Sequence, residues 1–440
     1  MFWIQHNKSM ELNRSKVGLP WPKPSRAHWP GHSGVRLMLR AFIEACKETV
    51  RRAWALAWGL ILVLCLGGTA LAAESPNTSP PNHPRHQRLS ASSRGAKHPA
   101  RLNLSGPKFQ RNAAFDALVE RLSRSSALPK AWVLQELAQA HHLESVRQWV
   151  LPAPRGVRKN WQAYRERFLT DQRIQWGKAF SEEHAKDLKK AEDLYGVPGS
   201  IVVAILGVET LYGRHMGQYP ALDALTTLAL DFPPNHPRHD ERAQFFEAEL
   251  AALLLLMKDE PHSYSHSHSH SHSHSPILSS YAGALGMAQF MPSNWRRFGV
   301  DFDGDGRVDL MHSASDAIGS VAHYLEAFGW RRGLPTHYAF EPSEWRMKEP
   351  AAAQWESLLA PDILPTFSPE RLQALGLTLS PEAALHPGLL AVVALENGAE
   401  PDSYVLGSEN FYVITRYNWS SYYAMAVIEL SQEIQAAQLR

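Results

Sequence analysis

Residues 201–206, Ile-Val-Val-Ala-Ile-Leu, form an unbroken apolar run that a folded chain has to bury. The run lies within Pro198–Thr210, a segment that we predict to be a helix. The same helix carries Glu209 near its end, and no charged residue stands between Asp193 and Glu209. Burial of this segment therefore brings a lone carboxyl group into apolar surroundings.

Apolar surroundings disfavour the carboxylate anion, so we expect the pKa of Glu209 to lie above its usual range. A glutamic acid that stays protonated near neutral pH can serve as a general acid in catalysis. The alternative is that Glu209 ends a helix and points to solvent, as most glutamates do. The motifs that follow it in the chain favour the catalytic interpretation.

The composition is that of a globular protein with a substantial core, because 44% of the 440 residues are hydrophobic and 10% are aromatic. This length predicts one large or two modest domains. The formal net charge of +2 conceals a basic N-terminal part, and residues 109–440 are net acidic. An acidic folded region argues against nucleic acid as a partner.

Residues 1–72 have the pattern of an N-terminal extension followed by a secretory signal peptide. Arg51 and Arg52 precede an uncharged stretch, 53–73, which contains a small-residue triplet at 70–72. We predict cleavage after this triplet and an exported, periplasmic protein. The alternative is an uncleaved membrane anchor, because the uncharged stretch is just long enough to span a bilayer. Both cysteines lie in this part, so we expect a mature chain without disulfide bonds.

The rest of the chain divides into a disordered tether at 73–108 and a folded catalytic region at 109–440. The tether is rich in Pro, Ser, His and Arg, and it has too few aliphatic residues to offset the entropy of ordering. In the folded region the apolar spacing predicts a mainly α-helical protein. The predicted helices are 182–195, 198–210 and 241–258, with further helical spacing between residues 109 and 145.

Residues 262–275 contain an alternation of Ser and His. Clustered imidazoles can bind Zn, Ni or Cu ions, but alternation without acidic or cysteine ligands fixes no coordination geometry. We predict a flexible low-complexity insertion in a surface loop, at most an opportunistic metal binder.

Residues 279–293 combine two glycines with several alanines, which permits close approach of backbone segments around a few polar groups. The amide of Gln289 offers both a donor and an acceptor, as a sugar hydroxyl or N-acetyl group requires. The segment therefore suits the wall of a binding groove. Tight helix packing is an equally simple reason for the glycines.

Residues 301–309, Asp-Phe-Asp-Gly-Asp-Gly-Arg-Val-Asp, match the start of a calcium-binding loop. The match fails at the last ligand position, where His312 stands in place of a bidentate Glu, and Asp316 is the nearest acidic replacement. We predict a structural Ca²⁺ of modest affinity and no cofactor for catalysis. The predicted ligands are Asp301, Asp303, Asp305, the Arg307 carbonyl and Asp316. The alternative is an Asp-Gly turn that has lost its metal.

Residues 410–423 are dense in aromatic side chains with polar tips. We predict a strand here that leads into a helix at 424–439. Aromatic faces stack on sugar rings while Asn and hydroxyl groups bond the sugar edges, so the segment suits a glycan groove. The same aromatic residues would also be ordinary in a protein core.

These motifs, taken together and in this order, resemble the lytic murein transglycosylase B family. The resemblance extends over residues 109–440. The matching segments are Gly207–Gly213, 282–293, 301–309, 316–324 and 411–418.

The resemblance implies a mainly α (α+β) fold with a lysozyme-like catalytic domain, an EF-hand-type calcium loop and small flanking subdomains. It implies cleavage of the β-1,4 bond between N-acetylmuramic acid and N-acetylglucosamine without water, which gives a 1,6-anhydromuramyl product. Glu209 aligns with the single acid/base of the family. One carboxyl group for both proton transfers agrees with the lack of an obvious second catalytic carboxylate in the sequence.

The resemblance also implies a set of substrate contacts. They are Tyr164, Ser280, Gln289, Tyr324, Tyr417, Asn418 and Tyr423. The implied partner is the glycan strand of peptidoglycan, bound by a monomer, with an association with the membrane or with wall-synthesis proteins left open. One departure is Glu241, which stands where the family often has a basic residue beside Arg242.

Two other functions remain open from the sequence alone. A muramidase would admit water and would need a second carboxylate, for which Asp223 is the closest candidate after Glu209. A wall-binding scaffold would keep the groove and the calcium loop without turnover. The intact Glu209 and Gln289 argue against the scaffold.

Overall fold

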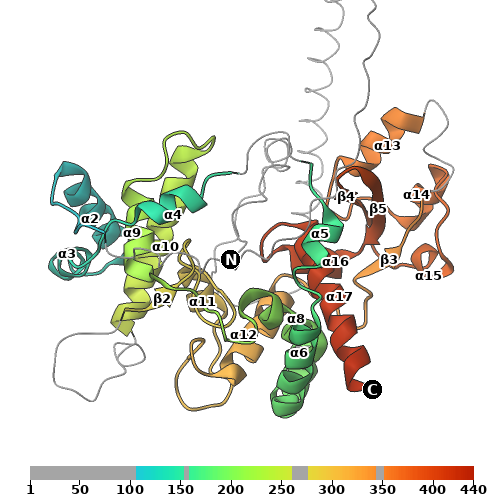
Figure 1. Ribbon diagram of the computed structural model, residues 1–440, viewed down its shortest axis with the longest axis horizontal. Helices are drawn as coiled ribbons and strands as arrows, with labels where there is room; N and C mark the ends of the chain where they lie inside the picture. The colour runs from blue at the N-terminus through green and yellow to red at the C-terminus, as the bar shows by residue number, and fades with distance from the viewer. Residues whose placement is uncertain (1–105, 153–157, 260–275, 343–350) are drawn as a thin grey trace, which may run out of the picture. The chain divides into compact units, whose positions relative to one another are not determined.

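The protein is mainly helical with few strands, as the sequence predicts (Figure 1). The structure is a computed structural model that describes residues 106–152, 158–259, 276–342 and 351–440. The predicted signal segment, nearly all of the predicted tether and the Ser–His tract lie outside these ranges.

Helices account for most of the described chain. The helices before the apolar run are α2 (Ala113–Ser126), α3 (Lys130–Leu137), α4 (Glu144–Trp149), α5 (Trp161–Arg165), α6 (Asp171–Glu183) and α7 (Ala185–Tyr195). The central helices are α8 (Gly199–Thr210), α9 (Ala221–Leu230), α10 (His239–Asp259), α11 (Pro292–Phe298) and α12 (Ala314–Ala327). The C-terminal helices are α13 (Ala351–Leu359), α14 (Pro369–Ala374), α15 (Pro381–Ala384), α16 (Glu409–Thr415) and α17 (Ser421–Gln438).

The described strands form two small antiparallel sheets. The strands are β1 (Tyr219–Pro220), β2 (Leu278–Ser279), β3 (His337–Ala339), β4 (Ala391–Asn397) and β5 (Glu400–Gly407). The first two pair with each other, and the others form a sheet of order β3-β5-β4 in which Val393 lies opposite Val405. A tight turn at Gly398, whose φ is +67°, joins β4 to β5. The three-stranded sheet was not predicted from the sequence.

Helix α8 is the centre of the main hydrophobic core. Every residue from Ile201 to Leu206 is buried, as the apolar run requires. The helix begins after Pro198, just beyond the left-handed Gly196 that ends α7. Its surface is covered by α17, α6, α12 and α7, and Figure 1 shows α8 beside α6 and α17. A helix apolar all round is stable only in such a buried position.

The predicted helix 182–195 is wrong in its first residues. Helix α6 runs to Glu183 and α7 begins at Ala185, with His184 between them at a non-helical φ of −108° and ψ of 25°. The His184 ring packs on Phe180, with 4.4 Å between ring centroids. The apolar spacing continues across this break, so the periodicity of the sequence does not reveal it.

The predicted strand at the start of residues 410–423 is also wrong, because 409–415 form α16. The Ser408 hydroxyl accepts a hydrogen bond from the Asn410 amide at 3.1 Å and caps this helix. The Asn410 side chain in turn donates to the carbonyls of Arg331 and Leu334, each at 2.8 Å. Contacts from distant parts of the chain thus override the strand preference of the aromatic and β-branched residues.

A second, smaller hydrophobic cluster surrounds the three-stranded sheet. Its large side chains include Phe340 and Trp355. A polar chain links this sheet to α16: the Tyr338 hydroxyl lies 3.0 Å from His386 Nδ1, and His386 Nε2 lies 3.0 Å from the Glu409 carboxylate. Because Glu409 is in the first turn of α16, the sheet and the helix are tied together by polar contacts as well as by packing.

Taken singly, no helix of the described ranges is both long and apolar enough to cross a membrane. Helices α7 and α8 meet those criteria only as a pair, with a bend of 115° between them.

Gly319 in α12 faces the Phe302 ring, and a Cβ atom at this position would lie 2.4 to 2.7 Å from three atoms of that side chain. We expect Gly319→Ala to lower the free energy of unfolding by about 1 to 3 kcal/mol, as overpacked cores do. Helix preference alone would instead stabilise the alanine variant by about 1 kcal/mol. Urea denaturation distinguishes the two signs, and a stabilised variant would show that Phe302 moves aside freely.

Candidate active site

Glu209 lies in the last turn of α8 and is half-buried. Its Oε1 atom accepts a hydrogen bond of 2.7 Å from the Tyr423 hydroxyl. Burial raises the pKa of Glu209 above its ordinary value, and this effect outweighs the opposite effect of the Tyr423 hydrogen bond. The raised pKa expected from the apolar run is therefore confirmed.

No Lys, Arg or His side chain of the described residues forms an ion pair with Glu209. Such a cation would stabilise the carboxylate and lower its pKa. Its polar neighbours are instead neutral tyrosines. The site is therefore arranged to hold a protonated carboxylic acid, the state that a general acid needs.

A group of buried tyrosines extends from Glu209 to α12. The Tyr423 ring stacks on Tyr417 with centroids 5.9 Å apart, and Tyr417 contacts Tyr324 at 4.9 Å. Burial raises the pKa of all three hydroxyls, and the charge of Glu209 acts in the same direction. Each ring is at most 3% exposed, so its faces pack against protein. The hydroxyls are bonded within the protein as well, since Tyr423 donates to Glu209 and Tyr324 donates to the Arg416 carbonyl at 2.8 Å.

Segment 279–293 contacts the same group of buried tyrosines and the end of α8. The Tyr417 hydroxyl donates to the Ala288 carbonyl at 3.2 Å. The hydroxyl of Thr210, next to Glu209, donates to the Met287 carbonyl at 2.9 Å. Three segments far apart in the sequence, around residues 209, 288 and 420, are thus bonded together. Thr210 was not among the predicted site residues, although its place beside Glu209 in the 207–213 motif was a signal.

Gln289 and Ser280 are buried, and both side chains form hydrogen bonds with backbone groups. Gln289 has a left-handed φ of +48°, and its side-chain amide donates to the carbonyls of Met216 and Gly286, each at 3.1 Å. The Ser280 hydroxyl accepts from the Ala284 amide at 3.0 Å. These hydrogen bonds give both side chains a part in shaping the loop.

Tyr164 and Asn418 lie at the edges of the tyrosine group. The Tyr164 ring packs on Phe168 at 5.0 Å and on Tyr422 at 5.7 Å. Burial raises the pKa of its hydroxyl, and so does the charge of Glu209. The side-chain oxygen of Asn418 is buried and has no hydrogen-bond partner among the described residues. A buried acceptor of this kind is available to a donor on a bound molecule.

Asp223, the candidate for a second carboxylate, has another task. Its Oδ1 atom accepts a hydrogen bond of 2.9 Å from the His141 amide, which joins α9 to the turn after α3. Burial raises the pKa of Asp223, and the His141 amide opposes that rise. The structure gives this side chain a role in packing the N-terminal helices.

The predicted calcium loop gathers three carboxylates. Ligand atoms of Asp301, Asp303 and Asp305 all lie within 4.8 Å of one another. Gly304 and Gly306, on either side of Asp305, have left-handed φ values of +81° and +90°, so the loop can turn tightly around a small centre. Oxygen atoms of this number and spacing fit a hard divalent cation such as Ca²⁺.

Asp316 does not join this cluster. Its buried carboxylate accepts hydrogen bonds from the amides of Phe302 and Asp309, each at 2.7 Å, and from the amide of Asp303 at 3.4 Å. These residues lie on both arms of the loop. Asp316 thus closes the base of the loop, and its role as the last calcium ligand stays a prediction.

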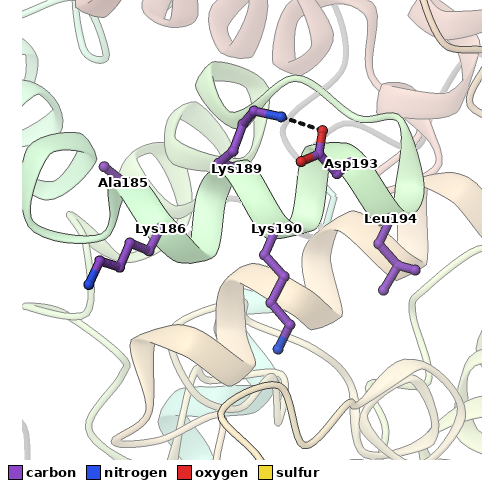
Figure 2. A pocket seen from close by; sticks show the side chains of 6 residues that line it. All are labelled: Ala185, Lys186, Lys189, Lys190, Asp193 and Leu194. Carbon is purple, nitrogen blue, oxygen red and sulfur yellow. Dashed lines mark hydrogen bonds and ion pairs between the residues drawn. The ribbon is translucent and has the colours of Figure 1, made fainter.

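Lys190 of α7 supports the loop from the other side, although no motif in the sequence marks it. Its ammonium group donates to the Phe302 carbonyl at 2.5 Å and lies 4.0 Å from the centroid of the Phe302 ring. Figure 2 shows Lys190 pointing away from the Lys189–Asp193 ion pair on the same helix. The shallow hollow drawn there, about 820 Å³, is lined by α7 alone and contains none of the predicted site residues.

A buried acid with a raised pKa lowers the free energy of unfolding at pH values above the pKa of the unfolded chain, and this effect gives a test of the site. Below the pKa of the unfolded chain, about 4.3, Glu209 is protonated in both states and contributes no difference. Above it, the unfolded chain ionises first and stability is lost as the pH rises through the folded pKa. We expect Glu209→Gln to melt about 1 to 3 °C higher than the wild type at pH 7 and at the same temperature at pH 4. Calorimetry at both pH values measures this, and a lower melting temperature at pH 7 would contradict it.

Comparison with known proteins agrees with this geometry. The chain matches the transglycosylase SLT domain family over residues 110–432. It is 33% identical over 344 residues to the membrane-bound lytic murein transglycosylase B of Escherichia coli (strain K12), which covers 76% of this chain and 86% of that protein.

Two solved structures are similar in fold. The Escherichia coli lytic transglycosylase Slt35 in complex with calcium has a TM-score of 0.62 at 32% identity, covering 76% of this chain and 96% of that one. SltB3 from Pseudomonas aeruginosa, in complex with NAG-anhNAM-pentapeptide, has a TM-score of 0.57 at 26% identity, covering 74% and 80%. The family match, the extent of the sequence identity and the shared fold lead to one assignment: this chain belongs to the transglycosylase SLT domain family.

Proposed function

We propose that the chain is a peptidoglycan lytic transglycosylase, an enzyme that cleaves the β-1,4 bond between N-acetylmuramic acid and N-acetylglucosamine and leaves a 1,6-anhydromuramyl end. The family and the relatives support this activity. Within the chain, the supporting observation is the single carboxyl group at the end of α8, whose pKa is raised by burial and which no cation of the described residues neutralises.

Glu209 performs both proton transfers in this proposal. In the first step its carboxylic acid protonates the glycosidic oxygen while the bond from that oxygen to C1 of the muramyl sugar breaks. In the second step the resulting carboxylate takes the proton of the muramyl 6-hydroxyl, and the oxygen of that hydroxyl bonds to C1. The ring closes, Glu209 is protonated again, and no water is consumed.

The hydrogen bond from Tyr423 divides the work between the two carboxyl oxygens. The Tyr423 hydroxyl donates to Oε1, so Oε2 is the atom that carries the transferable proton. The same hydrogen bond stabilises the carboxylate that forms between the two steps. Because burial raises the pKa of the Tyr423 hydroxyl, it remains a donor throughout. We therefore propose Tyr423 as a partner of Glu209 in addition to a substrate contact.

We propose that the other residues predicted to contact the substrate do so. They are Tyr164, Ser280, Gln289, Tyr324, Tyr417 and Asn418. The free Asn418 oxygen is an acceptor for a sugar hydroxyl or an N-acetyl N–H. The buried tyrosines, Ser280 and Gln289 contribute through the shape of the site and through polar atoms at its surface. A relative of this chain, SltB3, binds NAG-anhNAM-pentapeptide, which supports muropeptides as ligands.

We propose the domain organisation and location that the sequence predicts: a signal at 1–72, a tether at 73–108 and a catalytic region at 109–440 in the periplasm. The similar protein of Escherichia coli is membrane-bound, which keeps an anchored N-terminus as the alternative to a cleaved one. We also propose that the protein is a monomer and that small subdomains flank its catalytic domain.

The reaction can be tested with purified peptidoglycan sacculi and mass spectrometry of the released muropeptides. We expect products one water lighter than hydrolysed ones, and about 10²- to 10⁴-fold slower release by Glu209→Gln, since that variant has no proton to donate. Asp223→Asn is the matched control and should remain active. Reducing-end products would assign a muramidase, and retained binding without any release would assign a scaffold.

We also propose that Asp301, Asp303, Asp305 and the Arg307 carbonyl hold a structural Ca²⁺. The carboxylate cluster fits this ion, and the similar Slt35 was solved with calcium. When bound, the ion would neutralise the repulsion between the carboxylates and stiffen the tip of the loop. It takes no part in proton transfer.

Calcium should therefore raise the melting temperature, by an amount equivalent to about 2.7 kcal/mol when the ion is at a hundredfold excess over its Kd. Asp301→Ala should remove this increment, whereas Glu326→Ala, which removes an exposed carboxylate of α12, should retain it. Calorimetry with calcium and with a chelator makes the comparison. Identical melting in both conditions would mean that the loop binds no calcium.

A further inference from the structure

We propose that Arg173 and Tyr212 form a clasp between α6 and the end of α8, and that this clasp positions Glu209 for proton transfer. The inference rests on the proposed function, in which Glu209 is the acid. Their hydrogen bonds go to backbone carbonyls and not to the Glu209 carboxylate, so both act through the backbone that carries Glu209.

The backbone after Glu209 takes an unfavourable path. Leu211, Tyr212 and Gly213 are consecutive left-handed residues, with φ values of +52°, +60° and +83°. Left-handed backbone is disfavoured for residues with a Cβ, and such residues normally occur singly. A conformation of this kind persists only where the surroundings hold it, and it is concentrated at functional sites.

Tyr212 provides the first half of the clasp. The turn sends its side chain back beneath α8, where the ring stacks on Phe180 of α6 at 5.5 Å. Its hydroxyl donates a hydrogen bond of 2.9 Å to the Arg173 carbonyl, also in α6. The side chain is 8% exposed.

Arg173 provides the second half in the opposite direction. Its Nε atom donates to the Gly207 carbonyl at 3.1 Å, and another guanidinium nitrogen donates to the Arg167 carbonyl at 2.6 Å. Gly207 belongs to the last turn of α8, and its carbonyl also accepts the Leu211 amide at 3.2 Å, so it receives two hydrogen bonds. Arg173 thus accepts a hydrogen bond from Tyr212, two residues after the end of α8, and donates one to Gly207, two residues before Glu209.

Two glycines make room for the Tyr212 ring. A Cβ atom at Gly207 would lie 2.6 Å from the Tyr212 hydroxyl oxygen, and one at Gly177 would lie 2.5 Å from the same oxygen. Gly207 is in α8 and Gly177 is in α6, so each helix lacks a side chain where the tyrosine passes between them. The clasp is therefore specific to this ring in this place.

Glu209 lies between the two attachment points of the clasp. Gly207 is fixed by Arg173 on one side, and the turn at Leu211–Gly213 is fixed by Tyr212 on the other. The direction of the Glu209 side chain follows from the backbone between them. Proton transfer depends steeply on such placement, because a shift of about 1 Å can cost a hundredfold in rate.

The test uses Tyr212→Phe and Arg173→Met, each of which breaks one half of the clasp. We expect kcat on soluble glycan strands to fall about tenfold to a hundredfold while KM stays unchanged. Arg173→Lys retains a donor for the Gly207 carbonyl and should restore most of the activity. Tyr338→Phe is the matched control, because it removes a tyrosine hydroxyl of β3 that bonds to His386 and has no contact with the clasp.

Glu209→Gln, measured in parallel, distinguishes failure of the clasp from failure of the proposed acid. An active Glu209→Gln variant would remove the proposed function on which the clasp rests. An inactive one, with Tyr212→Phe and Arg173→Met both as active as the Tyr338→Phe control, would overturn the clasp alone. Losses of kcat that merely follow the unfolded fraction in a thermal melt, with no rescue by lysine, would also overturn it.

Discussion

The burial of α8 on all sides is the constraint on which the rest of the structure depends. The apolar run cannot face water, so helices from both ends of the folded chain pack around it, and Glu209 enters the core with it. The same packing excludes the water that would solvate a carboxylate. A helix exposed along one face could form equally well, but its terminal glutamate would ionise. The packing of α8 therefore has two effects. It stabilises the fold, and it raises the pKa of Glu209, which lowers stability at neutral pH.

The sequence predicts those parts of the fold whose partners are near in the chain. Helical spacing identified α2, α8 and α10 because one helix contains the whole pattern. The prediction failed at α16, where the local preference is for a strand. The Asn410 side chain of this helix donates to the carbonyls of Arg331 and Leu334, which are distant in the sequence. The prediction also missed the sheet, in which β3 pairs with β5 across an intervening stretch of 60 residues. Pairing over such distances is decided by the fold rather than by local composition.

At the site, the sequence identified residues but not the partners of their side chains. Glu209 was marked by an apolar environment that the sequence itself displays. Gln289 has several hydrogen-bonding atoms, and nothing in a linear sequence says that its amide bonds to the Met216 carbonyl. Tyr423 was expected at a sugar and lies against the acid. A polar side chain chooses among many partners, and only the three-dimensional arrangement makes that choice.

The base of the acidic loop has a consequence for how the protein would respond to its surroundings. Asp316 fastens both arms of the loop to α12 with its own oxygens, and Lys190 holds the Phe302 carbonyl from α7. The frame of the loop is thus built by protein groups, and only the tip between Asp301 and Asp305 is left to an ion. Gain or loss of the ion would be a local event that leaves α12 in place against α8. A loop built in this way would tolerate changing divalent-ion levels, and it is poorly suited to report those levels to Glu209.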